Sequence, residues 1–190
     1  MALHLRCLAP AVLVLLSLGH AAPATATTAT ATRCANAELV PNRSNADRVR
    51  SATLCLLNAE RTRRGLRTLT SERQLGRAAG SHSAQMVRLG FFDHVCPRGS
   101  TLNTRVRRGT TYLRNVRRFS LGENIAWGSG SLATPRAIVR TWMRSSGHRR
   151  NILDRRFRNV GIGVVTGAPD DVGGAPAATY TTTFGYRVKR

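Results

Sequence analysis

The stretches Gly-Glu-Asn-Ile-Ala at residues 122–126 and Gly-His-Arg-Arg-Asn-Ile-Leu at residues 147–153 are the most distinctive in this sequence. Two others share their character, Phe-Phe-Asp-His at residues 91–94 and Tyr-Thr-Thr-Thr-Phe-Gly at residues 180–185. Each stretch sets polar or titratable residues at the expected end of a regular element, where a rigid scaffold can present them to a cavity. The elements between these stretches therefore decide both the fold and the site.

Helical spacing dominates the chain before residue 145. Residues 44–65 predict a helix with a capping box of Ser44 and Asp47, an apolar face and a glycine stop. A second helix is expected to start at Thr70 or Ser71 and to stop at Gly90. A third is expected over residues 134–144, where a Thr-Pro start is typical of a helix N-terminus.

The end of the chain changes from helical to strand composition. Residues 160–166 and 179–188 are rich in Val, Ile, Thr, Tyr and Phe, which predicts strands, and residues 167–177 between them predict a long hairpin loop. Residues 99–122 are rich in Gly and Arg and predict a short helix and a long loop. Helices first and strands last in one core predict an α+β fold with α-β-α layers.

The N-terminus has the pattern of a cleaved signal peptide. Arg6 precedes an apolar run over residues 8–18 that is short for a bilayer span, and small residues suited to cleavage follow between Ala22 and Ala26. We therefore expect a secreted protein without a membrane anchor in its mature chain. A retained N-terminal anchor is the alternative.

The expected organisation has three parts. Residues 1–26 form the signal peptide, residues 27–43 a linker arm, and residues 44–190 a single domain. Hydrophobic residues make up 42% of the chain, enough to bury a core without a partner, so we expect a monomer.

Positive charge is the strongest feature of the composition. The chain has a net charge of +21, and cleavage after residue 26 removes only one charged residue, Arg6, to leave +20. Such a field attracts anionic lipids, phosphates and acidic polymers, and salt weakens the attraction. The densest basic stretch, residues 105–118, is either a polyanion-binding surface or a solvated loop. The arginines expected to act in polyanion binding are Arg107, Arg108, Arg114, Arg117 and Arg118.

Cysteines indicate one disulfide and one free thiol. Cleavage of the signal peptide leaves Cys34, Cys55 and Cys96, and an odd count in an oxidising compartment predicts one pair. We favour Cys34–Cys55, which would join the N-terminal arm to the first helix. Cys96, near the candidate site, is then the free thiol, although sequence alone leaves the other pairings open.

His94, Glu123 and His148 form the candidate site. Glu123 is the only carboxylate between Asp93 and Asp154. Two imidazoles and a carboxylate from separate segments suit a zinc site with an open position, or a proton-transfer pair with an orienting acid. Alternatively, the histidines are loop or capping residues and Glu123 pairs with one of the many arginines.

In this order, the segments resemble the CAP superfamily, the SCP-like fold of cysteine-rich secretory, antigen 5 and pathogenesis-related 1 proteins, in its bacterial secreted branch. The resemblance covers residues 54–186 and includes an Asn58-x-x-Arg61 signature and the pair His82-Ser83. It implies a single three-layer α-β-α sandwich with a surface cleft lined by two histidines and usually two glutamates.

Carried over residue by residue, the resemblance places five residues in the cleft: His94, Glu123, His148, Asn124 and Arg105. The first three would be the metal ligands, Asn124 would support Glu123, and bacterial members often carry arginine at the position of Arg105. The second glutamate has no counterpart, and Ser145 stands near its place without an assigned role. His82 is not matched to the cleft and is expected on a helix surface.

Three functions are compatible with these features. The favoured one is a secreted, non-enzymatic binding domain, with Zn²⁺ or another divalent cation at low occupancy in the cleft and extracellular lipid or anionic envelope polymer as partner. The second is a metal-dependent hydrolase or protease with Glu123 as base. It lacks a His-Glu-x-x-His motif, and Cys96 has no partner nearby in the sequence. The third is polyanion or nucleic-acid binding by the basic loop, although export argues against nucleic acid.

Overall fold

The computed structural model describes residues 34–190, so the predicted signal peptide lies outside the described residues. None of the helices in residues 34–190 is both long enough and apolar enough to cross a bilayer. The elements in chain order are α1 (Ala46–Thr62), β1 (Thr70–Ser71), α2 (Arg73–Leu89), α3 (Leu102–Gly109), β2 (Val116–Ser129), the 3₁₀ helix η1 (Gly130–Ala133), α4 (Pro135–Arg144), α5 (Ser146–Leu153), β3 (Asn159–Thr166) and β4 (Ala177–Lys189).

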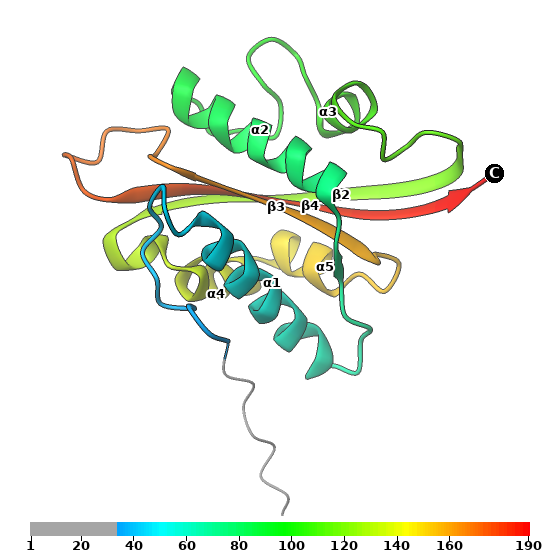
Figure 1. Ribbon diagram of the computed structural model, residues 1–190, viewed down its shortest axis with the longest axis horizontal. Coiled ribbons are helices and arrows are strands. Elements are labelled where there is room, and N and C mark those ends of the chain that lie inside the picture. Colours follow the sequence, from blue (N-terminus) through cyan, green and yellow to red (C-terminus); the bar gives the residue numbers. More distant parts are fainter. Residues whose placement is uncertain (1–33) are drawn as a thin grey trace, which may run out of the picture. The chain divides into compact units, whose positions relative to one another are not determined.

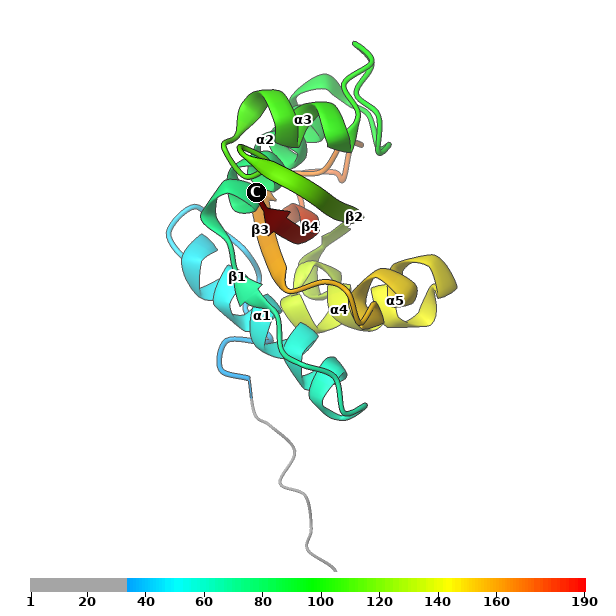
Figure 2. The same cartoon turned by 90° about the vertical axis from the view of Figure 1, so that its right-hand side faces the viewer.

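The strands form one four-stranded sheet with the order β1-β3-β4-β2 (Figure 1). β4 pairs antiparallel with both β3 and β2, whereas the short β1 pairs parallel with β3. α2 and α3 cover one face of the sheet, and α1, α4 and α5 cover the other (Figure 2). This is the predicted three-layer α-β-α sandwich, and it leaves β2 at an edge of the sheet.

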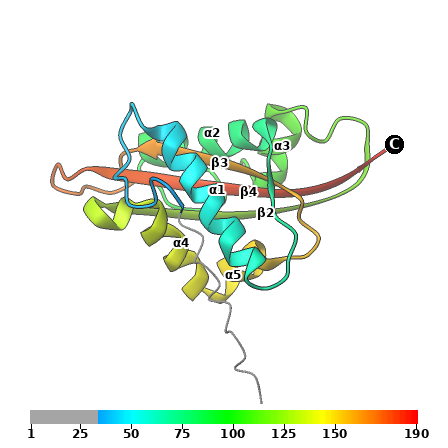
Figure 3. The same cartoon turned by 60° about the horizontal axis from the view of Figure 1, so that its bottom comes forward.

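The layer of α1, α4 and α5 encloses the larger apolar core. Figure 3 looks onto this layer, where α1 lies beside α4 and α5. Trp142 is fully buried and donates its indole N–H to the carbonyl oxygen of Ile125 in β2 at 3.0 Å. The ring of Phe157 stacks on that of Phe184 in β4, with 5.6 Å between centroids. These contacts fix α4 and α5 against the strands that carry the site.

α2 packs directly on the backbone of β3. A Cβ at Gly161 would lie 2.0 Å from the backbone nitrogen of Gly76, and one at Gly163 would lie 2.4 Å from the backbone of Ala79. Only glycine on β3 allows this approach. The position of α2, and of every side chain that it carries, therefore depends on two glycines of the neighbouring strand.

The Asn58-x-x-Arg61 signature has a structural role. Arg61 is fully buried, and its guanidinium donates to backbone carbonyl oxygens only, those of Arg67, Ile152, Asp154 and Phe157. The side chain of Asn58 both donates to and accepts from the backbone of Leu69. The signature thus joins the end of α1 to the segments that lead into β1 and β3.

Several sequence predictions are confirmed. Thr134 caps α4 with Pro135 at its start, and Gly90 ends α2 with a left-handed φ of 62°. The two predicted strands fall within β3 and β4. Cys34 and Cys55 form a disulfide, and Cys96 is a buried free thiol.

Three boundaries differ from the predictions. α1 begins after Asn45 without a side-chain cap, so the capping box of Ser44 is absent. Residues 70–71 form β1, and α2 starts only after Glu72, whose carboxylate accepts from the backbone of the new helix. The predicted long loop before residue 122 is shorter, because β2 begins at Val116. Residues 70–71 and the start of β2 form strands because they pair with β3 and β4, which are distant in the sequence.

Candidate functional site

Glu123 is the centre of the site. It lies on the edge strand β2, and its side chain is only 3% exposed. Nη2 of Arg105, from α3, donates to both carboxylate oxygens at 2.8 and 2.7 Å. Nδ1 of His94, from the loop after α2, lies 3.0 Å from Oε1 of Glu123. The structure therefore brings three of the predicted residues together.

The electrostatics of this cluster fix its protonation. Burial alone would raise the pKa of Glu123, but the hydrogen bond with His94 and the charge of Arg105 outweigh it and hold the pKa below its usual range. An ionised carboxylate can only accept hydrogen bonds, so Nδ1 of His94 carries the shared proton. Nε2 of His94 has no hydrogen-bond partner among residues 34–190, and half of the His94 side chain is exposed.

Arg105 also holds the loop that carries His94. Nη1 of Arg105 donates to the carbonyl oxygens of His94 and Ser100, at 3.0 and 2.8 Å. The arginine side chain is 5% exposed. One buried guanidinium thus balances the charge of Glu123 and positions the backbone on both sides of the loop.

The prediction of a surface position for His82 is wrong. Its side chain is fully buried, with Nε2 3.0 Å from the carbonyl oxygen of Asp93 and 3.8 Å from Oε1 of Glu123. The loop after α2 folds back over the helix and covers the ring, and Phe91 lies against it with 6.0 Å between ring centroids. The sequence held a signal for this position, because the buried residues of α2 recur at helical spacing: Leu75, Ala78, Ala79, His82 and Met86.

Cys96 has a hydrogen-bonded environment that the sequence did not reveal. A carbonyl oxygen only accepts, so Nε2 of His82 carries the proton and its Nδ1 faces the Cys96 Sγ at 3.6 Å. Burial lowers the pKa of His82, which keeps the ring neutral at pH 7. The thiol also lies 3.2 Å from Oε1 of Gln85. A buried, hydrogen-bonded thiol of this kind suits a structural role better than that of an exposed nucleophile.

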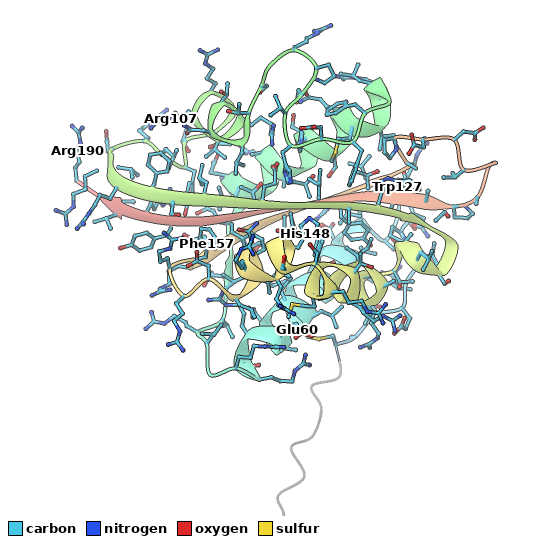
Figure 4. The ribbon with its side chains drawn as sticks, turned by 180° about the vertical axis from the view of Figure 1, so that it is seen from behind. Glu60, Arg107, Trp127, His148, Phe157 and Arg190 are labelled. Atoms are coloured by element: carbon cyan, nitrogen blue, oxygen red, sulfur yellow. A yellow bond between two sulfur atoms is a disulfide. The ribbon has the colours of Figure 1, made fainter. Side chains whose placement is uncertain are left out.

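His148 reaches the site from the opposite layer. Successive side chains of a strand point to opposite faces, so Glu123 meets α2 and α3 while Asn124 meets α5. Asn124 donates to the carbonyl oxygen of His148 at 3.1 Å, and Asn151 donates to the Asn124 side chain at 2.9 Å. Asn124 therefore positions His148, beside the sheet in Figure 4, rather than the carboxylate of Glu123.

The imidazole of His148 is partly buried and remains unpaired. Its Nδ1 is buried without a hydrogen-bond partner, and burial, with a smaller contribution from nearby His94, lowers its pKa. No ion pair joins His148 to Glu123. Within residues 34–190, no three His, Cys, Asp or Glu side chains are grouped to hold a metal ion.

This geometry does not suit Glu123 as a direct metal ligand. Both of its carboxylate oxygens already accept from a cation, Arg105, which a metal ion would have to displace. The free Nε2 of His94 and the unpaired ring of His148 are the donors that remain. Zinc binding by the three predicted ligands remains a prediction.

Two other predicted features lie at the margin of the site. Ser145 stands between α4 and α5, and its side chain makes no hydrogen bond within residues 34–190. Of the aromatic pair before His94, Phe92 is 45% exposed. The pair belongs to the loop that covers α2, so only Phe91 is partly buried.

The predicted polyanion residues are all exposed but do not form one surface element. Arg107 and Arg108 lie on α3, Arg114 lies in the following turn, and Arg117 and Arg118 lie at the start of β2.

Residues 54–185 match the CAP family, the cysteine-rich secretory protein family, and the chain belongs to it. It is 38% identical over 111 residues to the protein YkwD of Bacillus subtilis, across 58% of this chain and 40% of YkwD. It is 30% identical over 111 residues to the membrane protein YlbC of the same organism, across 58% of this chain and 30% of YlbC. The chain thus spans less than half of either relative.

Solved structures give the same assignment. An extracellular SCP-domain protein from Bacillus anthracis str. Ames matches with a TM-score of 0.56 and 27% identity, over 76% of this chain and 43% of that chain. An outer surface protein from Borrelia burgdorferi matches with a TM-score of 0.55 and 16% identity, over 70% of this chain and 87% of that chain. The second match reflects the shared fold alone.

Proposed function

We propose that this protein is a secreted CAP-type binding domain that binds its ligand through the imidazoles of His94 and His148. The observation that carries the proposal is the 3.0 Å contact between Nδ1 of His94 and Oε1 of Glu123. A metal-binding histidine usually donates its other ring N–H to a carboxylate, which orients the ring and strengthens it as a ligand. Glu123 serves His94 in this way and leaves Nε2 free.

A divalent cation such as Zn²⁺ suits these two donors. Arg105 balances the charge of Glu123, so the carboxylate orients His94 without entering the coordination shell. Two protein ligands are fewer than the three or four of well-occupied zinc sites, which favours low occupancy. When bound, the cation would supply a Lewis-acidic point of attachment for an anionic or carbonyl group of the ligand.

Secretion is part of the same proposal. The signal-peptide pattern of residues 1–26 and the disulfide between Cys34 and Cys55 both favour an oxidising compartment outside the cytoplasm. Two structural relatives are described as an extracellular protein and an outer surface protein.

The test is calorimetric titration of the metal-stripped mature protein with Zn²⁺. We expect one saturable site that is lost in His94→Ala and His148→Ala and retained in Ser145→Ala, the control beside the cleft. Glu123→Gln is expected to weaken binding by about 10- to 100-fold, the usual effect of removing an orienting group. Absence of binding in the wild type, or binding that survives His148→Ala, would contradict the proposal.

A further inference from the structure

Two neighbouring cavities lie on the α2–α3 side of the sheet. The larger, of about 650 Å³, lies between α2, α3 and the loop of residues 98–100. The smaller, of about 510 Å³, continues past the C-terminal end of α3. Both are lined by Arg77, Arg108 and Gly109, so they are direct neighbours, and together we call them the arginine groove.

The lining of the arginine groove carries one sign of charge. None of its residues is Asp or Glu. Polar hydroxyls of Ser81, Ser100 and Thr104 complete the larger cavity. The arginines among the lining residues are Arg77, Arg98, Arg105, Arg107, Arg108 and Arg114, and the guanidinium of Arg105 is buried against Glu123.

Most of this charge has no internal counterion. Arg105 is paired with Glu123, but Arg77, Arg98 and Arg108 make no ion pair or side-chain hydrogen bond within residues 34–190. Glu72, the acidic residue immediately before α2, pairs with Arg187 at 3.2 Å. The larger cavity alone is therefore lined by three arginines without a partner among residues 34–190.

The guanidinium of Arg107, at the side of the groove, is held in place by two contacts. Nε of Arg107 donates to the Asn103 side chain at 3.0 Å, and its guanidinium lies over the ring of Phe119, 5.0 Å from the centroid. Stacking and hydrogen bonding restrict the side chain before any ligand arrives. Figure 4 shows Arg107 on the opposite side of the sheet from His148.

Like charges gathered in a concave site repel one another and focus a positive potential, and a bound anion relieves both effects. The planar guanidinium fork matches the oxygens of a phosphate group. The groove runs along α3, whose 8 residues span about 12 Å, room for more than one such group. We propose that the arginine groove binds a linear polyanion with repeating phosphate groups, independently of the ligand proposed for His94 and His148.

The test measures binding of fluorescently labelled inorganic polyphosphate at several salt concentrations. The groove variant is Arg77→Ala/Arg98→Ala/Arg108→Ala. The control is Arg48→Ala/Arg140→Ala/Arg144→Ala, which removes three arginines that are also exposed but lie on α1 and α4, on the other face. Because all six side chains are exposed and unpaired, both variants should keep the wild-type melting temperature.

We expect the groove variant to bind at least tenfold more weakly. The slope of the logarithm of its binding constant against the logarithm of the salt concentration should become less steep by roughly 0.7 for each lost phosphate contact. The control should bind within threefold of the wild type. Equal losses in the two variants would show that net charge alone attracts the polyanion and would overturn the proposal. A third arm uses phosphatidylglycerol vesicles: if they bind to the groove as tightly as polyphosphate does, the linear polymer is the wrong source of phosphate.

Discussion

Arginine has opposite roles at Glu123 and in the arginine groove. On the side that faces β2, Arg105 is buried, and both carboxylate oxygens of Glu123 accept from it. Around the cavity between α2 and α3, Arg77, Arg98 and Arg108 are exposed and have no acidic partner among residues 34–190. The difference is whether a carboxylate lies within reach. Where one does, the charge stabilises the fold and orients His94; where none does, the charge is available to an external anion.

The largest loss of stability is expected from a substitution that displaces α2, because both regions depend on this helix. Gly161→Ala would place a Cβ 2.0 Å from the backbone of α2, so the helix must move. We expect a loss of at least about 5 kcal/mol in the free energy of unfolding, in the range of exceptional single substitutions. Gly80→Ala, within α2 and with no atom near the new Cβ, is the control and should change stability by less than about 1 kcal/mol in urea denaturation.

The second effect distinguishes paired from unpaired arginine. Arg105→Ala leaves Glu123 buried without its cation, and breaking a buried ion pair in this way costs about 3–5 kcal/mol. Arg108→Ala removes an exposed, unpaired charge and should change stability by less than about 0.5 kcal/mol. Equal losses of unfolding free energy for the two variants in urea denaturation would contradict the distinction between paired and unpaired arginines.

The third effect depends on pH. The pKa of Glu123 is lowered in the folded protein, so its ionised form contributes stability that is present above about pH 4.3, the usual pKa of glutamate, and is lost as the pH falls through the folded value. Glu123→Gln should therefore be less stable than the wild type at pH 7 by about 2 kcal/mol. This difference in the free energy of unfolding should disappear at acidic pH. A gap that stays constant from pH 7 to pH 3 would contradict the assignment of an ionised Glu123.

The smallest change in binding is expected for two arginines that the sequence analysis placed among the polyanion-binding residues. Arg117 and Arg118 lie at the start of β2 and line neither cavity. Exposed charges that do not contact the ligand act on it only through the solvent, where salt screens them. Arg117→Ala/Arg118→Ala should weaken polyphosphate binding less than twofold, and a loss as large as that of the groove variant would extend the binding surface onto β2.

The fold was largely predictable because its elements carry local signals. Thr134 and Pro135 mark the start of α4, and Gly90 marks the end of α2. β2 was missed because Glu123 and Asn124 are both buried, one on each face, which hides the alternation of a half-exposed strand. Its identity as a strand depends on pairing with β4, which is far away in the sequence.

The site was predictable in membership but not in arrangement. His94, Glu123 and Arg105 meet as expected, yet the pairing of Arg105 with both oxygens of the carboxylate depends on how α3 packs against β2. His82 was misplaced because the loop that buries it folds back over α2 from beyond the helix end. Contacts of this kind have no signature in spacing or composition.

The most direct test of the contrast between the two regions observes individual arginines. We would record the Nε–Hε NMR signals of the mature protein, assigned with Arg→Lys variants, while adding inorganic polyphosphate. The signals of Arg77, Arg98 and Arg108 should shift and saturate together, whereas that of buried Arg105 should remain in place. If Arg105 shifts with them, or if all exposed arginines shift alike, the division into a paired site and an open groove is wrong.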